Sequence, residues 1–178
     1  MSLRLSLQIF DHEPAHPAGA RLWLGGATDL TTRTMTADPP RWLLIADHAP
    51  EQTPTPPERP ALRHWEMEQI NPGDVGSPPS AGGVILVSMN VDPTHEDEFN
   101  DWYNLEHIPH FNRLDGVITA RRFRAIEGEP RYVALYHVAN TGIYATPGWM
   151  AANETPWILR MRRFQRDRTY FMFRQRIA

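Results

Sequence analysis

The alternation of apolar and polar positions divides the chain into short strands and a few helices. Residues 83–91, "GVILVSMNV", are almost wholly apolar and predict a strand buried on both faces. Residues 92–114 have apolar positions at three- and four-residue steps and predict a helix, which Pro109 should kink or end just before that residue. Thr146-Pro147 and Thr155-Pro156 predict two short helices, because threonine caps a helix and proline suits its first turn.

A Pro-, Gly- and Ser-rich stretch, "NPGDVGSPPSAGG", interrupts this pattern near the middle of the chain. Such a composition suits neither helix nor sheet and predicts a linker. We therefore expect one unit over residues 1–75, a linker over 76–83 and a second unit over 84–178.

The two units carry matching segments. "GATDLTTRTMTADPPRWLLIADHA" from Gly26 aligns without gaps with "GVITARRFRAIEGEPRYVALYHVA" from Gly116. Both share a glycine, a Pro-Arg-aromatic triplet and an apolar run, and each predicts a β-hairpin. An offset of about 90 residues is too long for a solenoid repeat and indicates a duplicated domain.

The second unit has the order β-α-β-β-α-β, which is ferredoxin-like. The first unit keeps four strands, with its first helix reduced to "AGARLWLGG" (18–26) and its second replaced by proline-rich 50–60. Helices cover only one face of such a sheet, so the other face needs a partner. We expect an α+β fold in which two ferredoxin-like repeats, the first degenerate, pack their four-stranded sheets face to face as a pseudo-dimeric antiparallel α+β barrel.

The segment "DEFNDWYNLEHIPHF", with the strands and the "ANETPWILRM" helix that follow it, resembles the dimeric α+β barrel superfamily. Within that superfamily it is similar to small EthD-like proteins with an "F-x-x-W-Y-x-x-E-H-I-P" helix. The resemblance covers residues 84–178, whereas only the hairpin supports it over 1–75. It implies the barrel fold, which hosts cofactor-free monooxygenases, lactone isomerases, dehydratases and haem-degrading enzymes. EthD-like members are associated with the breakdown of xenobiotic or aromatic compounds, and His107 takes the position of a first-helix histidine that faces a cavity.

Composition narrows the chemistry. Of the 178 residues 41% are hydrophobic and 22% charged, which is typical of a globular protein, and we expect a cytoplasmic one because no signal peptide or membrane span is evident. There is no cysteine, which excludes a thiol nucleophile, and all 18 basic residues are arginine, which excludes lysine Schiff-base chemistry. The net charge of −3 gives no reason to expect nucleic acid or membrane as a partner, so a small-molecule ligand is expected.

The predicted helix places candidate catalytic residues on one face. His107 can exchange protons near neutral pH, Glu106 can orient it, and Tyr103 can hydrogen-bond a substrate oxygen. The same face also suits plain packing against the sheet, with the polar residues at its solvated edge. Glu106, His107 and His110 have metal-ligand chemistry, but Pro109 disturbs their spacing, so we expect neither a metal nor another cofactor.

Candidate substrate-binding residues are Trp102, His110, His137, Arg122 and Trp149. His137 lies mid-strand, where a lone histidine is also typical of a satisfied core residue, and its repeat partner is Asp47. Arg122 can hold an acidic small molecule through paired hydrogen bonds, and surface solvation is the alternative.

Two functions remain open. The first is a small-molecule catabolic enzyme, a cofactor-free isomerase, lyase or monooxygenase, that uses His107 for acid–base chemistry on an aromatic or xenobiotic-derived substrate. The second is a non-catalytic small-ligand-binding or assembly protein on the same fold. We also expect a homodimer, because the first unit lacks helices to cover its sheet.

Overall fold

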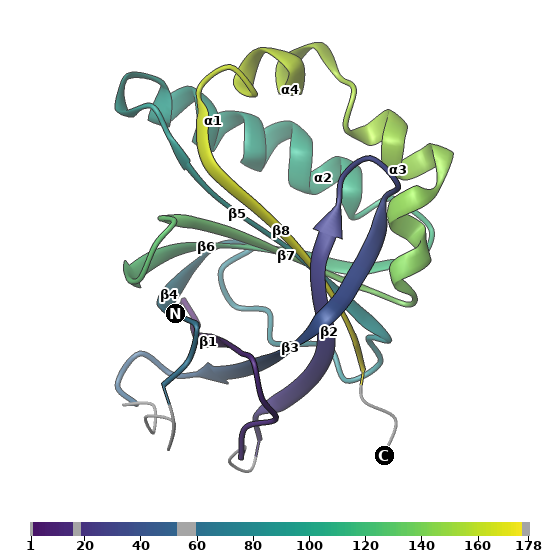
Figure 1. Ribbon diagram of the computed structural model, residues 1–178. Coiled ribbons are helices and arrows are strands. Elements are labelled where there is room, and N and C mark those ends of the chain that lie inside the picture. Colours follow the sequence, from purple (N-terminus) through teal and green to yellow (C-terminus); the bar gives the residue numbers. More distant parts are fainter. Residues whose placement is uncertain (1, 16–18, 53–59, 176–178) are drawn as a thin grey trace.

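The computed structural model describes residues 2–15, 19–52 and 60–175. Their secondary structure is dominated by eight antiparallel strands: β1 Arg4–Phe10, β2 Arg21–Asp29, β3 Thr34–His48, β4 Arg63–Asn71, β5 Gly83–Val91, β6 Val117–Glu127, β7 Tyr132–Val138 and β8 Gln165–Gln175. The strands form a closed barrel in the order β1-β3-β2-β8-β5-β7-β6-β4 (Figure 1). The α+β barrel expected from the sequence is thereby confirmed.

Both halves of the barrel have the same strand order. In the first half β1 lies between β3 and β4, and in the second half β5 lies between β7 and β8. In each half the strands therefore lie side by side in the order fourth, first, third, second along the chain. This is the order of a ferredoxin-like sheet. The duplication, with its boundaries at 1–75, 76–83 and 84–178, stays a prediction.

The two sheets are not separate layers, however, because they join along two seams. β2 pairs with β8, and β4 pairs with β6. At the first seam the backbone of Gly25 lies against β8 so closely that a Cβ atom there would be 1.9 Å from the Met172 carbonyl oxygen. Both edge strands of each half are therefore paired with an edge strand of the other half.

The helices all follow β5 in the chain and lie over one side of the barrel (Figure 1). They are a 3-10 turn at Pro93–His95, α1 Glu96–Trp102, a π-helical segment Tyr103–His107, α2 Ile108–Phe111, a 3-10 turn at Thr141–Ala145, α3 Pro147–Ala152 and α4 Pro156–Met161. The hydroxyls of Thr146 and Thr155 cap α3 and α4, as the Thr-Pro pairs predict. The described part of the first half contains no helix.

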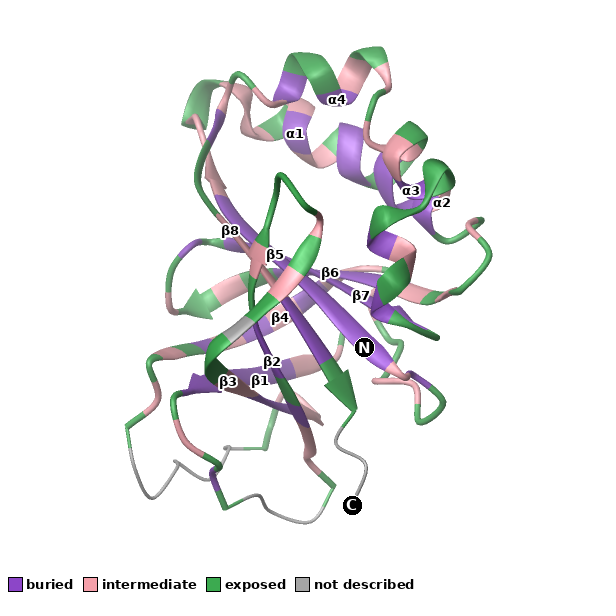
Figure 2. Cartoon of the chain, turned by 45° about the vertical axis from the view of Figure 1, so that its right-hand side comes forward, coloured by how far each residue is buried: buried purple, intermediate pink, exposed green. Residues whose placement is uncertain are grey.

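The apolar side chains form two cores on opposite sides of the second sheet. One fills the barrel and includes Leu7, Trp65, Leu86 and Leu135. The other lies between β5–β8 and the helices and is rich in aromatic residues. Figure 2 shows buried residues along the strands and on the inner sides of the helices. Alternation along β5 and β7 explains this arrangement, because successive side chains point to opposite faces.

Two details of the first half differ from the sequence prediction. Residues 21–26, expected to belong to a shortened helix, are part of β2. The first hairpin turns at residues 30–33, earlier than the ungapped alignment implies, because the Asp29 carboxylate accepts the backbone N–H groups of Thr31 and Thr32. The prolines at 39 and 40 instead lie in β3 where its pairing with β2 shifts register. Most of the proline-rich segment 50–60 lies outside the described residues.

Among the described residues, no helix is long and apolar enough to cross a membrane.

Candidate functional site

The helical run 96–111 is positioned by a wide turn at its centre. The backbone N–H of Ile108 bonds to the carbonyl of Tyr103, five residues back, which defines the π-helical segment. Pro109 supplies no N–H, and its ring would clash with the carbonyl four residues earlier in a regular helix. Of the two predicted effects of Pro109, an end of the helix is wrong, because the helix continues to Phe111, and the proline is instead accommodated by the wide turn that precedes it.

The wide turn decides which side chains reach the sheet. Phe99, Tyr103, His107 and Phe111 follow steps of four residues, and all four are buried. Steps of four overshoot a regular α-helical turn, whereas a wider turn keeps such residues aligned. The result is a continuous aromatic face that lies on β5 and β7.

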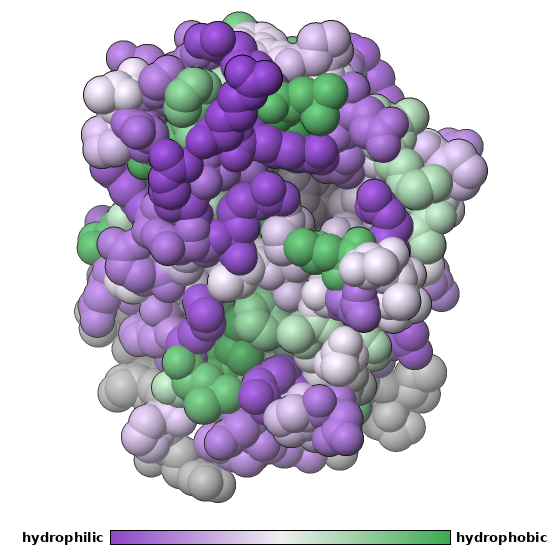
Figure 3. All heavy atoms as spheres, turned by 45° about the horizontal axis from the view of Figure 1, so that its top comes forward, coloured by the Kyte–Doolittle hydropathy of each residue, from purple (hydrophilic) through white to green (hydrophobic). Residues whose placement is uncertain are grey.

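A cavity of about 160 Å³ lies between this face and the second half of the barrel. Its buried part is mainly aromatic, with walls from Trp102, Tyr103, His107, Phe111, Tyr136 and Trp149. Cavities of roughly 150 Å³ can accommodate one benzene ring. On the helix-bearing face a hollow is bordered mostly by hydrophilic residues (Figure 3).

His107 is the ionisable group at the buried end. Its side chain is joined to β7 by a hydrogen bond of 2.8 Å between Nε2 and the Tyr136 hydroxyl. Burial, reinforced by the positive charges of the nearby Arg122 and Arg162, lowers the pKa of His107 to about 3. The imidazole is therefore neutral at physiological pH and serves as a hydrogen-bonding group.

Tyr103 and Arg122 form a second polar layer next to His107. The Arg122 guanidinium carbon lies 4.3 Å from the centre of the Tyr103 ring, and the rings of Phe99 and Tyr132 are within 4.9 Å. Its Nη2 donates to Asn100, whereas Nε and Nη1 are buried without a partner. Burial lowers the pKa of Arg122 to about 10 and raises the pKa of Tyr103 to about 12, so both are protonated at neutral pH.

The more exposed side of the cavity carries three arginines, Arg33, Arg162 and Arg168. Arg33 comes from the β2–β3 turn of the first half, whose tip reaches the helix layer near α3 (Figure 1). Arg162 follows α4, and its Nη2 donates to the carbonyl oxygen of Asn153 at 2.6 Å. Arg168 lies on β8 and donates to the Tyr170 hydroxyl. The first half thus contributes directly to this site.

The structure brings together four of the eight predicted site residues. Trp102, Tyr103, His107 and Trp149 line one cavity, and Arg122 lies directly behind Tyr103. The expected pairing of Glu106 with His107 is not observed, because the Glu106 carboxylate accepts the Thr155 hydroxyl at the start of α4. The wide turn also leaves His110 partly exposed and outside the cavity wall.

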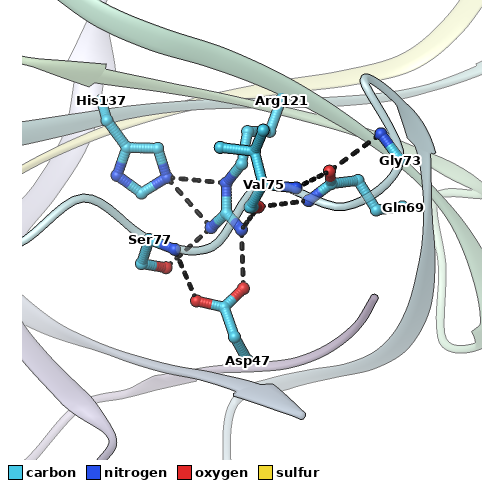
Figure 4. A network of polar contacts seen from close by, with 7 residues as sticks. All are labelled: Asp47, Gln69, Gly73, Val75, Ser77, Arg121 and His137. Carbon is cyan, nitrogen blue, oxygen red and sulfur yellow. Dashed lines mark hydrogen bonds and ion pairs between the residues drawn. The ribbon is translucent and has the colours of Figure 1, made fainter. Parts of the chain in front are cut away.

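His137 lies on the opposite face of β7, inside the barrel. Its Nε2 is 3.2 Å from Nε of Arg121, which in turn donates to Asp47 at 2.6 Å and to Ser77 at 2.7 Å (Figure 4). Ser77 of the linker accepts from Arg121 and donates its backbone N–H to Asp47, so the network attaches the linker to both halves of the barrel. His137 is accordingly a buried partner of Arg121. His137 and Asp47, which match each other in the repeat alignment, both bond to this arginine.

The possible metal ligands do not converge. Among the residues that the structure describes, no three His, Cys, Asp or Glu side chains are grouped as a metal ion would need. The residues that sequence reasoning missed are Tyr136 and the three arginines of the cavity. They come from two strands, a turn and a position after a helix, so no spacing along the chain marks them. β7 is buried along its whole length, so its apolar pattern did not indicate which of its side chains face the helix.

Comparisons with known proteins place the fold. No family model matches the chain, and no curated protein matches it either. A ferredoxin-fold protein from Listeria monocytogenes, related to antibiotic biosynthesis monooxygenases, has 10% identity and a TM-score of 0.59, covering 99% of this chain and 97% of that one. A candidate chlorite dismutase has 10% identity and a TM-score of 0.54, covering 99% and 96%. A staphylococcal regulator of pathogenesis has 9% identity and a TM-score of 0.58, covering 98% and 99%. The chain therefore has a ferredoxin-like fold, and these likenesses concern the fold alone.

Proposed function

We propose that this chain is an enzyme that acts on a small, ring-sized molecule in the cavity beside His107. The observation that carries the proposal is the placement of a buried, hydrogen-bonded imidazole in the wall of a cavity of about 160 Å³ lined by aromatic rings. A pocket with a few polar groups in an apolar wall is the usual form of a small-molecule site. The similarity of the first helix to EthD-like proteins supports a substrate that is aromatic or derived from a xenobiotic, processed in catabolism.

His107 and Tyr136 are the groups that would act on the substrate, with Tyr103 beside them. The Tyr136 hydroxyl fixes the imidazole through Nε2, and a bound molecule can exchange a proton or a hydrogen bond with this pair. A proton taken up by His107 adds positive charge close to Arg122 and Arg162. Negative charge that develops on the substrate would offset that charge, so the site favours reactions that pass through an enolate, phenolate or carbanion-like species.

The alternative is a non-catalytic ligand-binding or assembly protein. The neutral state of His107 favours it, because a general base is most effective when its pKa lies near the working pH. Trp102, Tyr103 and Trp149 would support this alternative if they filled the pocket, but they form its wall around open volume.

Turnover of a substrate distinguishes the enzyme from the non-catalytic ligand-binding protein. A panel of single-ring aromatic compounds is incubated with the protein while absorbance and oxygen consumption are followed. We expect His107→Ala to lower kcat/KM by about 100-fold or more, the lower range of general acid–base assistance. His110→Ala is the matched control, since it removes a histidine from the same helix outside the cavity wall. Binding without turnover, or full activity of His107→Ala, would favour the ligand-binding function.

A further inference from the structure

The charge distribution around the cavity differs from that of the whole protein. The chain has 21 acidic and 18 basic residues, yet the residues that line the cavity include three arginines and neither aspartate nor glutamate. Within the described ranges, no carboxylate lies within 4.0 Å of the guanidinium nitrogens of Arg33, Arg162 or Arg168, in contrast to other surface arginines such as Arg160 and Arg166. The positive charge at this site is therefore left uncompensated by the protein.

The three guanidinium groups keep hydrogen-bond donors for another partner. Each group has five N–H donors. Arg162 uses Nη2 on the Asn153 carbonyl, and Arg168 points its Nε and Nη2 at one tyrosine hydroxyl. Arg33 is held over the Tyr144 ring, with its guanidinium carbon 5.7 Å from the ring centre. These contacts hold the three arginines beside the cavity and leave some of their N–H donors unused.

The polarity of the cavity is therefore graded from inside to outside. The buried end presents aromatic rings and the neutral His107, whereas the more exposed side presents the arginines with Asn153. A ligand that matches both ends has an apolar ring and an anionic group attached to it. Planar guanidinium groups bind carboxylates through paired, charge-assisted hydrogen bonds.

We infer that the ligand of this cavity is a small aromatic carboxylate, whose ring enters between Trp102 and Trp149 and whose carboxylate is bound by Arg33, Arg162 and Arg168. The inference rests on the proposed function, and it specifies the substrate class of the same site. Its volume limits the buried part to about one ring. Burial is the main reason that the pKa of His107 is low, and a negatively charged ligand would offset the charges that add to it, which links binding to proton transfer.

Benzoate and benzamide are suitable probes, because they have the same ring and nearly the same shape but differ in charge. Binding to the intact protein is measured by titration calorimetry at low ionic strength, and NMR of the indole N–H groups of Trp102 and Trp149 reports entry of the ring. We expect both indole signals to shift with benzoate, and benzoate to bind at least about tenfold more tightly than benzamide. Added salt should weaken this preference, since exposed charges are screened.

Two variants test whether the arginines cause the preference for benzoate over benzamide. Arg33→Gln/Arg168→Gln should bring the affinity for benzoate to within about threefold of that for benzamide. Arg163→Gln is the matched control, because Arg163 is exposed, neighbours Arg162 and does not line the cavity. It should leave the preference unchanged, and circular dichroism verifies that each variant is folded.

The outcomes distinguish this inference from the proposed function. Equal binding of both probes with shifted indole signals, or a benzoate preference that survives in the double variant, overturns the anionic ligand while leaving a ring-binding cavity. If neither probe shifts the signals of Trp102 and Trp149, the cavity does not admit a ring, and the proposed function is overturned together with the inference.

Discussion

At the scale of single residues, His107 combines deep burial with a hydrogen bond to a neutral hydroxyl, since the adjacent Glu106 is paired with Thr155 instead. Its side chain is 5% exposed, and the cations around it act in the same direction as burial on its pKa. An unfolded chain would hold this histidine near its ordinary pKa of about 6.5. Folding therefore removes a proton from the histidine at mildly acidic pH, which makes stability depend on pH.

The first prediction concerns that dependence. Because the folded pKa of His107 is about 3, the unfolded state binds one more proton between roughly pH 3 and pH 6.5, and stability falls as the pH falls through this range. From pH 7 to pH 5 this histidine alone should account for a loss of about 2 kcal/mol. His107→Gln should reduce the loss by that amount in urea unfolding at the two pH values. A variant that loses as much stability as the wild type would contradict the neutral state of His107.

The second prediction concerns Arg121, whose side chain is fully buried and whose carboxylate partner is Asp47. Burial lowers the pKa of Arg121 and the Asp47 charge opposes that shift, so the pair keeps the guanidinium ionised inside the barrel. Asp47→Ala leaves a buried cation uncompensated, which typically costs about 3–5 kcal/mol. Ser77→Ala removes only one neutral acceptor and should cost about 1 kcal/mol. Equal costs in denaturant unfolding would show that the ion pair contributes nothing beyond a hydrogen bond.

The residues of the candidate site were partly predictable. Helical spacing was enough to group Trp102, Tyr103 and His107, because neighbours on one helix face stay together in the fold. Glu106 was grouped with them wrongly, since the period of a regular helix does not reveal a wide turn. Tyr136 and the arginines were missed because their proximity arises from tertiary structure, and the sequence contains no local mark of it.

At the scale of elements, capping residues gave reliable boundaries. Thr146 and Thr155 accept the N–H groups of Trp149 and Ile158, each at 3.3 Å, as the Thr-Pro motifs predict. The first hairpin was less predictable, because an aspartate turn at residues 30–33 competes with a Pro-Pro pair that looks like a turn. Local chemistry thus located the helix starts, whereas strand ends depended on which of two turn signals prevailed.

The third prediction tests how α4 is attached to the helix that bears His107. Thr155 both caps α4 and donates to the Glu106 carboxylate, so Thr155→Ala should cost about 2 kcal/mol in unfolding free energy. Thr146→Ala should cost only about 1 kcal/mol, because its hydroxyl donates to a neutral carbonyl, that of Ile143. Thr155→Ser keeps both bonds and should restore most of the stability. A serine variant as unstable as the alanine variant would exclude the hydroxyl as the cause.

At the scale of the whole molecule, the closed barrel changes the argument for self-association. The described strands leave no free edge for a second copy, and Ser6 and Gln8 on the outer side of β1 are buried within the chain itself. The expected homodimer stays a prediction, and it would need a surface other than a strand edge. Sedimentation equilibrium of the full chain at micromolar concentration measures its mass directly.

The last prediction tests the pseudo-dimeric arrangement itself. A fragment of residues 76–178 contains all the helices and exposes the two edge strands, β6 and β8, that the first half pairs with in the whole chain. Two fragments can pair β6 of one copy with β8 of the other, since both halves share one strand order. The fragment lacks Asp47, so Arg121 would be buried without its carboxylate, and Arg121→Leu should make the fragment dimer more stable. We expect this variant to sediment as a discrete dimer with native β-sheet circular dichroism. A folded monomer, or aggregates without a dimer species, would show that the two halves are not interchangeable and would remove the duplication from the explanation of the fold.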